Sequence, residues 1–222
     1  MEMLEAMVLD TVAIIFAGIH FSIPLFYYVY LKHAYLNRAW NIKIDEKYRP
    51  KLTVIVPTVN EAEIIEKRLE NLYHQDYPKD LMEIVVIDSA SEDGTADIVR
   101  KWAREKKVNL RLLEEGKRRG KLNALKRVLM EVSSESEIVV FTDADAFWDR
   151  CALKEAMKYF ADPKIGSVTA SMGYTETSIE DTYRNFYNEI RVAESKIYST
   201  PVHNGPFLAI RAEFVRKNGL PD

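Results

Sequence analysis

An uncharged stretch near the N-terminus sets the first limit on how this 222-residue chain can fold. The 21 residues 11–31 contain no Asp, Glu, Lys or Arg. A helix of that length rises about 31 Å at about 1.5 Å per residue, which matches the hydrocarbon core of a bilayer. Tyrosines and Trp40 crowd its C-terminal end, where amphipathic rings favour the headgroup region. We therefore predict a transmembrane anchor over residues 1–36.

Two other interpretations of this stretch are weaker. A buried helix of a soluble protein would explain the polar or helix-breaking residues His20, Ser22 and Pro24, but no second apolar stretch exists to surround such a helix. A cleaved signal peptide is disfavoured because the residues before position 11 include three acids where a signal peptide carries basic residues.

Basic residues follow the predicted span and set its orientation. Lys32, His33, Arg38 and Lys43 come after the apolar stretch, so the positive-inside rule places the rest of the chain in the cytoplasm. We predict a cell-membrane protein with at least one span. Residues 37–50 are interpreted as a charged linker, and residues 51–222 as one folded domain.

The remainder of the chain alternates β-rich runs with amphipathic stretches at helical spacing. This alternation is typical of an α/β domain with a mostly parallel sheet. The expected strands are 52–57, 83–88, 110–113, 137–142, 165–170 and 207–211.

Charge and cysteine content exclude several functions. Lys and Arg number 31 against 34 Asp and Glu, and a net charge of -3 gives no basic excess for holding nucleic acid. Cys151 is the only cysteine, which excludes a disulfide framework within the chain and a zinc cluster built on cysteines.

Polar side chains collect where the predicted strands end. Asn60 and Glu61 follow the first strand, Asp88 ends the second, and Asp143 and Asp145 follow the fourth. Ligands of open α/β sheets bind at the carboxyl ends of strands, and two carboxylates one residue apart suit a magnesium–diphosphate site. The alternative is that both acids cap the next helix or lie in a turn. Polar residues at the other strand ends favour the binding site.

Two common phosphate-binding motifs are absent. No G-x-G-x-x-G follows the first strand. Gly120-Lys121 lacks the upstream glycine and the following Ser or Thr of a P-loop. A bound diphosphate would therefore need a metal to neutralise it.

Five motifs in order carry a family resemblance. They are P-T-V-N-E at 57–61, V-V-I-D-S-A-S-E-D-G-T at 85–95, R-G-K-L-N-A-L at 119–125, F-T-D-A-D at 141–145 and N-G-P-F-L-A-I-R at 204–211. Over residues 51–222 the chain resembles the family 2 glycosyltransferases with the GT-A fold. With its leading apolar helix it is similar to the membrane-bound polysaccharide-synthase branch of that family.

The resemblance implies a nucleotide-sugar pocket, a metal site and an acceptor loop. It assigns to the pocket Pro57, Thr58, Asn60, Glu61, Asp88, Gly120, Lys121 and Asp143, with Glu61 and Asp88 near the base and ribose. It implies that Asp143 and Asp145 bind Mg²⁺ or Mn²⁺ on the diphosphate. Asn204 and Gly205 match the acceptor-side loop.

The chain departs from the family pattern in two ways. Ser89 stands where the family often has a second Asp, which removes one carboxylate from the nucleotide pocket. The family's catalytic base belongs to an acidic motif downstream of 217–222, so we expect the base beyond Asp222 and a domain truncated there. Glu189 and Glu194 are candidate substitutes, although their polar neighbours favour a solvated helix face.

The expected function is a membrane-anchored, metal-dependent inverting hexosyltransferase. Its donor would be a nucleotide-sugar, with a UDP-sugar favoured, and its acceptor a glycan or a polyprenyl-phosphate-linked sugar. The alternatives are a fragment or pseudoenzyme that binds donor without transferring it and, less favoured, a nucleotidyltransferase, which would release pyrophosphate.

Overall fold

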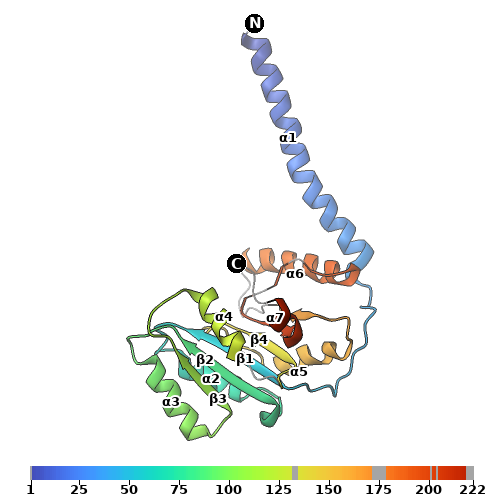
Figure 1. Cartoon of the computed structure of the whole chain (residues 1–222). Coiled ribbons are helices and arrows are strands. Elements are labelled where there is room, and N and C mark those ends of the chain that lie inside the picture. The colour runs from blue at the N-terminus through green and yellow to red at the C-terminus, as the bar shows by residue number, and fades with distance from the viewer. Residues whose placement is uncertain (1, 132–134, 172–178, 201, 204, 219–222) are drawn as a thin grey trace. The chain divides into compact units, whose positions relative to one another are not determined.

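Our computed structural model describes residues 2–131, 135–171, 179–200, 202–203 and 205–218. The chain divides into two compact units, one formed by Met1–Asn41 with Met172–Val202 and the other by Ile42–Ser171 with His203–Asp222. The first unit holds the long N-terminal helix, and the second holds the β-sheet (Figure 1).

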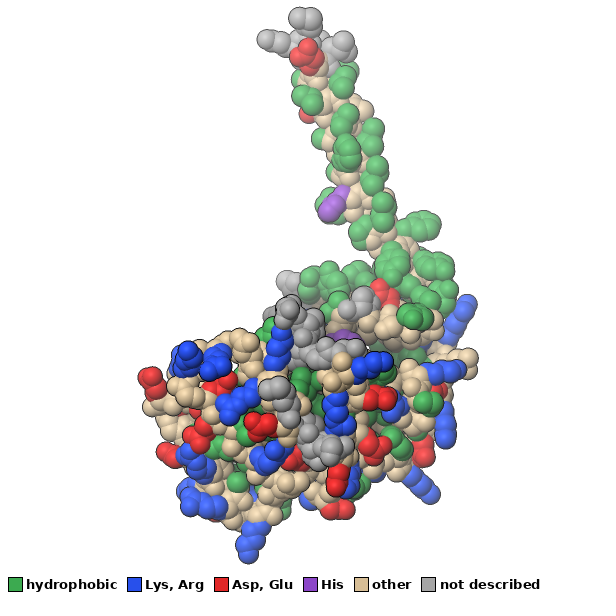
Figure 2. Space-filling view, viewed as in Figure 1, with side chains coloured by type: hydrophobic (Ala, Val, Ile, Leu, Met, Phe, Trp, Pro, Cys, Tyr) green, Lys and Arg blue, Asp and Glu red, His purple; other side chains and the backbone are tan. Residues whose placement is uncertain are grey.

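Helix α1 (Glu2–Leu31) forms where the apolar stretch predicts it and continues as a π-helical turn over Lys32–Leu36. The candidate span Glu5–Leu36 contains an 18-residue window with a mean hydropathy of 1.9, and none of that window is buried. Hydrophobic side chains coat this helix in Figure 2. By length and composition, α1 is able to cross a membrane.

Helix α6 (Ile179–Ile197) packs against the C-terminal end of α1 through side-chain hydrogen bonds. The Tyr28 hydroxyl donates to Glu189 at 2.7 Å, and the Tyr27 hydroxyl donates to Glu194 at 2.8 Å. The expectation of a solvated face holds only in part for Glu189 and Glu194, because both are partly exposed but also accept hydrogen bonds from α1. Their carboxylates hold α6 to α1, which also removes the reason to propose them as substitute bases.

The second unit is built on a six-stranded sheet with the order β3-β2-β1-β4-β6-β5. The first four strands are parallel, while β6 runs antiparallel to both β4 and β5. The expectation of a mostly parallel sheet is confirmed, with most strand ends within one residue of the prediction. The strands are β1 (Leu52–Thr58), β2 (Met82–Asp88), β3 (Leu110–Glu114), β4 (Ile138–Phe141), β5 (Ser167–Thr169) and β6 (Leu208–Arg211).

Helices cover both faces of this sheet, so its central strands are apolar on both sides. Val54 and Val56 of β1 face a core shared with α2, α3 and α5, whereas Ile55 faces a second core shared with α4 and α7. These helices are α2 (Ile65–Tyr73), α3 (Thr95–Lys106), α4 (Lys121–Glu131), α5 (Ala152–Met157) and α7 (Ala212–Asn218), with short 3₁₀ turns at Lys79–Leu81 and Lys158–Ala161.

Residues 42–50 are held to the rest of the sheet unit by hydrogen bonds between backbone groups and side chains. The Lys43 amide donates to the Asp162 carboxylate at 2.8 Å. The buried Tyr77 hydroxyl donates to the Pro50 carbonyl at 2.6 Å. The second half of the expected linker 37–50 is thus bound to the domain that follows it. The domain limits at residues 36 and 50 stay predictions.

Gly94 supplies the turn between β2 and α3, because its φ of 90° is unfavourable for residues with a Cβ. We expect Gly94→Ala to cost about 1–2 kcal/mol, which lowers the melting temperature by about 2–8 °C in a chain of this size. Gly116→Ala is the matched control, since Gly116 lies outside the positive-φ region and a Cβ there meets open space. Equal melting temperatures for Gly94→Ala and the wild type would contradict this account.

Candidate functional site

The parallel register brings three polar strand ends to one edge of the sheet. Thr58 pairs with Asp88 at the ends of β1 and β2, and Ile55 of β1 pairs with Phe141 at the end of β4. The segment that carries Asp143 and Asp145 therefore begins beside the loop that follows β1. This confirms the juxtaposition that the strand-end pattern predicts.

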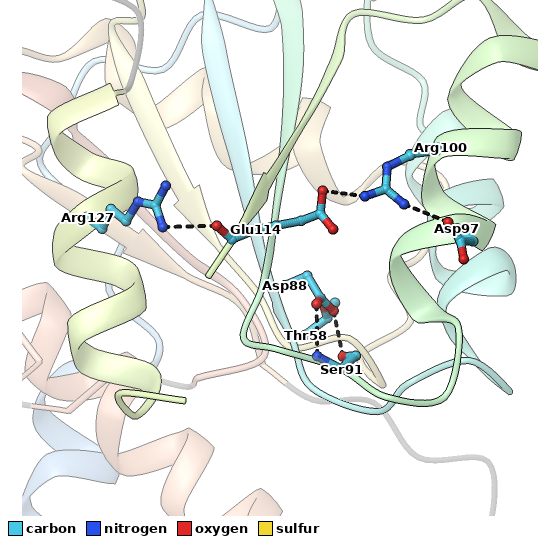
Figure 3. A network of polar contacts seen from close by, with 7 residues as sticks. All are labelled: Thr58, Asp88, Ser91, Asp97, Arg100, Glu114 and Arg127. Atoms are coloured by element: carbon cyan, nitrogen blue, oxygen red, sulfur yellow. Dashed lines mark hydrogen bonds and ion pairs between the residues drawn. The ribbon is translucent and has the colours of Figure 1, made fainter. Parts of the chain in front are cut away.

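Asp88 is a buried carboxylate that organises the loop after β2. It is 3% exposed and accepts hydrogen bonds from the Thr58 hydroxyl at 3.3 Å, the Ser91 amide at 3.0 Å and the Ser91 hydroxyl at 2.5 Å (Figure 3). These bonds tie the start of the loop after β2 to the end of β1, and the base or ribose contact expected of Asp88 stays a prediction.

The loops after β1 and β2 are cross-linked to one another. Asn60 has a left-handed φ of 56°, its amide donates to the Ser91 hydroxyl at 2.8 Å, and its side-chain carbonyl accepts from the Glu92 amide at 3.0 Å. The Glu61 amide donates to the Thr95 hydroxyl at 2.9 Å. Asn60 and Glu61 therefore have a rigid backbone at this edge, next to Pro57 and Thr58 of β1.

Glu115 is a candidate site residue that the sequence reasoning missed. It follows β3, is 7% exposed, and accepts a hydrogen bond from the Ser89 hydroxyl at 2.7 Å. Its amide donates to the Asp88 carbonyl at 2.9 Å. The chain has Ser89 in place of an aspartate, and the fold supplies a carboxylate beside it. The strand-end rule, applied to β3 as well, would have found Glu115.

The neighbouring Glu114 forms an ion pair with Arg100, and its side chain is about half exposed. Glu115 is therefore the buried carboxylate of the two. Arg100 bridges Glu114 and Asp97, and Arg127 of α4 donates to the Glu114 carbonyl at 3.1 Å (Figure 3). These contacts tie α3 and α4 to the end of β3.

The acidic pair after β4 meets a cation and a glycine. Lys121, at the start of α4, forms an ion pair with half-buried Asp143, and Gly120 precedes it with a φ of 88°. A Cβ built on Gly205 would lie 3.6 Å from the second carboxylate oxygen of Asp143, so Gly205 is close to the pair. Asp145 is exposed. Asn204, the other expected acceptor-side residue, lies outside the described residues.

Negative charge accumulates between the loops after β1 and β4. Burial and the charges of Asp145 and Asp93 raise the pKa of the Glu61 carboxyl. Crowded carboxylates of this kind favour a bound cation. The Lys121 ammonium at Asp143 shows that a cation fits there.

The described part of the chain contains no group of three or more metal-ligating side chains. A divalent ion held at Asp143 and Asp145 would therefore need further oxygen ligands from water or from a bound diphosphate, which is the usual arrangement for magnesium. The donor set fits such a group.

A family comparison relates this chain to sugar-transferring proteins. The family described as Glycosyl transferase family 2 matches residues 53–219. A mannosyltransferase from Pyrobaculum calidifontis, solved in complex with GDP-Man and Mn²⁺, is 45% identical with a TM-score of 0.86. The match covers 96% of this chain and 59% of that one. The expected GT-A fold is confirmed.

Two staphylococcal relatives match the same region. The poly(ribitol-phosphate) β-N-acetylglucosaminyltransferase TarS of Staphylococcus aureus is 30% identical over 161 residues, which is 68% of this chain and 28% of TarS. The poly-β-1,6-N-acetyl-D-glucosamine synthase of Staphylococcus epidermidis is 28% identical over 158 residues, or 71% of this chain and 37% of the synthase. The chain spans about a third of the length of these relatives.

The raised pKa of Glu61 gives a direct test of the site's electrostatics. We expect Asp145→Asn to lower the pKa of Glu61, because it removes a neighbouring negative charge. Carboxyl titration by NMR measures this change, with Asp149→Asn as the control at an exposed acid on the same segment. A Glu61 pKa that does not respond to Asp145→Asn would show that the two carboxyls are not neighbours.

Proposed function

The chain belongs to glycosyl transferase family 2, and we propose that it is a metal-dependent, inverting hexosyltransferase that uses a nucleotide-sugar donor. One observation carries the proposal. Asp143 and Asp145 follow β4 at the edge where β1 and β2 also end, and Asp143 already pairs with a cation. This arrangement supports a diphosphate bound between the acidic pair and the loops that hold Asp88 and Asn60.

The donor would lie with its nucleoside over the ends of β1 and β2. Thr58, Asp88 and Glu115 offer buried oxygen acceptors there, which suit the N–H and O–H groups of a base and a ribose. The mannosyltransferase relative was solved with GDP-Man, and the TarS relative is named for N-acetylglucosamine transfer. GDP-mannose and a UDP-sugar are therefore the first donors to compare.

The diphosphate would meet Gly120, Lys121 and the acidic pair. Asp143 and Asp145 would hold Mg²⁺ or Mn²⁺, and the Mn²⁺ in the mannosyltransferase complex supports a divalent ion. When bound, the ion supplies charge neutralisation for the leaving diphosphate. Lys121 must release Asp143 for this to occur, and its ammonium can then contact a phosphate oxygen, because the side chain is long and about 59% exposed.

The acceptor would approach from the side of Gly205 and Asn204. In an inverting transfer the acceptor hydroxyl attacks the anomeric carbon while the nucleoside diphosphate leaves, so the protein's main task is to hold both in line. Gly205 has no side chain beside Asp143, which leaves room for a sugar near the diphosphate. We propose a glycan or a polyprenyl-phosphate-linked sugar as the acceptor.

We further propose that α1 anchors the chain in a cell membrane with the sheet unit in the cytoplasm. The support is the unburied apolar span Glu5–Leu36 and the basic residues Lys32, Arg38 and Lys43 after its apolar core. This arrangement would give the site access both to cytosolic nucleotide-sugars and to lipid-linked acceptors.

Donor binding tests the proposed function. We expect GDP-mannose or UDP-N-acetylglucosamine to bind the wild-type chain with Mn²⁺ and more weakly without it, as measured by calorimetry. Asp143→Asn and Asp145→Asn should each weaken this binding by about tenfold or more, because each removes a charged metal ligand. Asp149→Asn, an exposed acid on the same segment, should bind as the wild type does.

Two outcomes would contradict that proposal. If Asp143→Asn and Asp145→Asn bind donor as tightly as Asp149→Asn does, the assigned metal site is wrong. Release of pyrophosphate from a nucleoside triphosphate and a sugar phosphate would instead identify a nucleotidyltransferase.

Membrane anchoring has its own test. We expect the chain to stay in the membrane fraction after a carbonate wash. The double variant Phe16→Lys with Ile19→Lys should be released, since each charge at mid-span costs about 2.5–3.5 kcal/mol. The control double variant Phe147→Lys with Phe214→Lys changes exposed apolar residues outside the span and should stay bound. A wild-type chain recovered in the wash would contradict the anchor.

A further inference from the structure

Arg68 is a charged side chain wholly inside the sheet unit. It lies on α2 and is 0% exposed, and among the described residues no carboxylate comes within ion-pair distance of its guanidinium. The guanidinium instead lies 4.3 Å from the centre of the Trp148 ring, and its Nε atom has no hydrogen-bond partner. Burying a charge in this way destabilises the fold.

One hydrogen bond from Arg68 leads to the segment that carries the acidic pair. The guanidinium donates from Nη2 to the buried Thr142 hydroxyl at 2.7 Å. Because arginine has no acceptor, the Thr142 hydroxyl must accept this bond, and its own proton is left for a carbonyl. The Pro206 carbonyl, at 2.9 Å, is the nearer of the two carbonyls within reach. Arg68 thus sets the orientation of the Thr142 hydroxyl.

A second hydrogen bond reaches the other end of the same segment. The guanidinium donates from Nη1 to the Asn71 side-chain oxygen at 2.6 Å. Asn71 in turn accepts from the Trp148 amide at 2.9 Å and donates to the Trp148 carbonyl at 2.8 Å. Residues 142 and 148 flank Asp143 and Asp145, so one guanidinium secures both ends of the segment that carries them.

The same contacts extend to the acceptor-side loop. The Pro206 carbonyl accepts from both the Thr142 hydroxyl and the Trp148 indole N–H, each at 2.9 Å. Gly205, the residue before it, is the one whose Cβ would approach Asp143. The spacing between the acidic pair and this loop is therefore fixed by hydrogen bonds that begin at Arg68.

We propose that Arg68 is a positioning residue that acts through Thr142 and Asn71 to hold the metal-binding acidic pair and the Gly205–Pro206 loop at a fixed separation. The inference rests on the proposed function, because this separation matters only if donor and acceptor meet there. Burial lowers the pKa of Arg68 to about 9, and the charges of Asp143 and Asp145 act in the opposite direction. The guanidinium is therefore still charged at neutral pH.

The test compares stability with Mn²⁺-dependent binding of GDP-mannose and UDP-N-acetylglucosamine to the whole chain. We expect Arg68→Met to keep or raise the melting temperature, since it removes an unpaired buried charge. Mn²⁺-dependent donor binding should weaken about 10- to 100-fold, the loss typical of mutating a residue that orients metal ligands without touching the metal. Arg68→Lys keeps the charge and one donating nitrogen and should recover part of the affinity. Arg104→Met, at an exposed arginine of α3, should change neither quantity.

A double-mutant cycle with Thr142→Val tests the route. If Arg68 acts through Thr142, Arg68→Met should weaken binding less in the Thr142→Val background than in the wild type. Fully additive losses would overturn the route. Donor binding by Arg68→Met equal to the wild type, or a lower melting temperature with unchanged affinity of the folded chain, would overturn the positioning role. A wild-type chain that binds neither donor with Mn²⁺ would overturn the proposed function itself, and the inference with it.

Discussion

The parallel pairing of β1 with β2 on one side and β4 on the other is the constraint on which the candidate site depends. Because these neighbouring strands run in the same direction, the residues that follow them lie at the same edge of the sheet. Each strand ends in a polar residue or is followed by a polar loop. The buried apolar faces on both sides of the sheet fix this register, because a slip of one residue would exchange the two cores. Hydrophobic packing of the sheet therefore places the segments that carry Asp88 and Asp143 at the same edge, on either side of β1.

The acidic side chains at this edge repel one another, and two basic side chains, Lys121 and Arg68, offset that repulsion in different ways. The Lys121 side chain is long and about 59% exposed, so it can be displaced from Asp143 when a divalent cation binds. Arg68 is buried and fixed, and it works through the hydroxyl of Thr142 instead of through direct contact with a carboxylate. Burial and, after it, the charges of Asp145 and Asp93 raise the pKa of the Glu61 carboxyl, so negative charge at this edge is not fully balanced. A divalent ion with a diphosphate would relieve it.

Periodicity and strand-end chemistry predicted most of the fold and the acidic edge, because both follow from local patterns. What they missed depends on contacts between distant residues. From its sequence, an arginine on an amphipathic helix is expected at the surface. Arg68 is instead fully buried, with Trp148 packed against its guanidinium. Glu189 and Glu194 likewise read as solvated until the fold brings α1 beside them. Glu115 directly follows the third strand, so the rule that ligands bind at the carboxyl ends of strands also points to it.

Crystallography of the chain with GDP-mannose and Mn²⁺, recorded at a wavelength where manganese scatters anomalously, tests the central claim most directly. The account predicts one anomalous peak about 2.1 Å from carboxylate oxygens of Asp143 and Asp145, the distance typical of a small divalent ion with oxygen ligands. The same ion should contact the diphosphate, with Lys121 withdrawn from Asp143. A donor bound with its diphosphate away from this pair, or a manganese ion bound elsewhere in the sheet unit, would contradict the account.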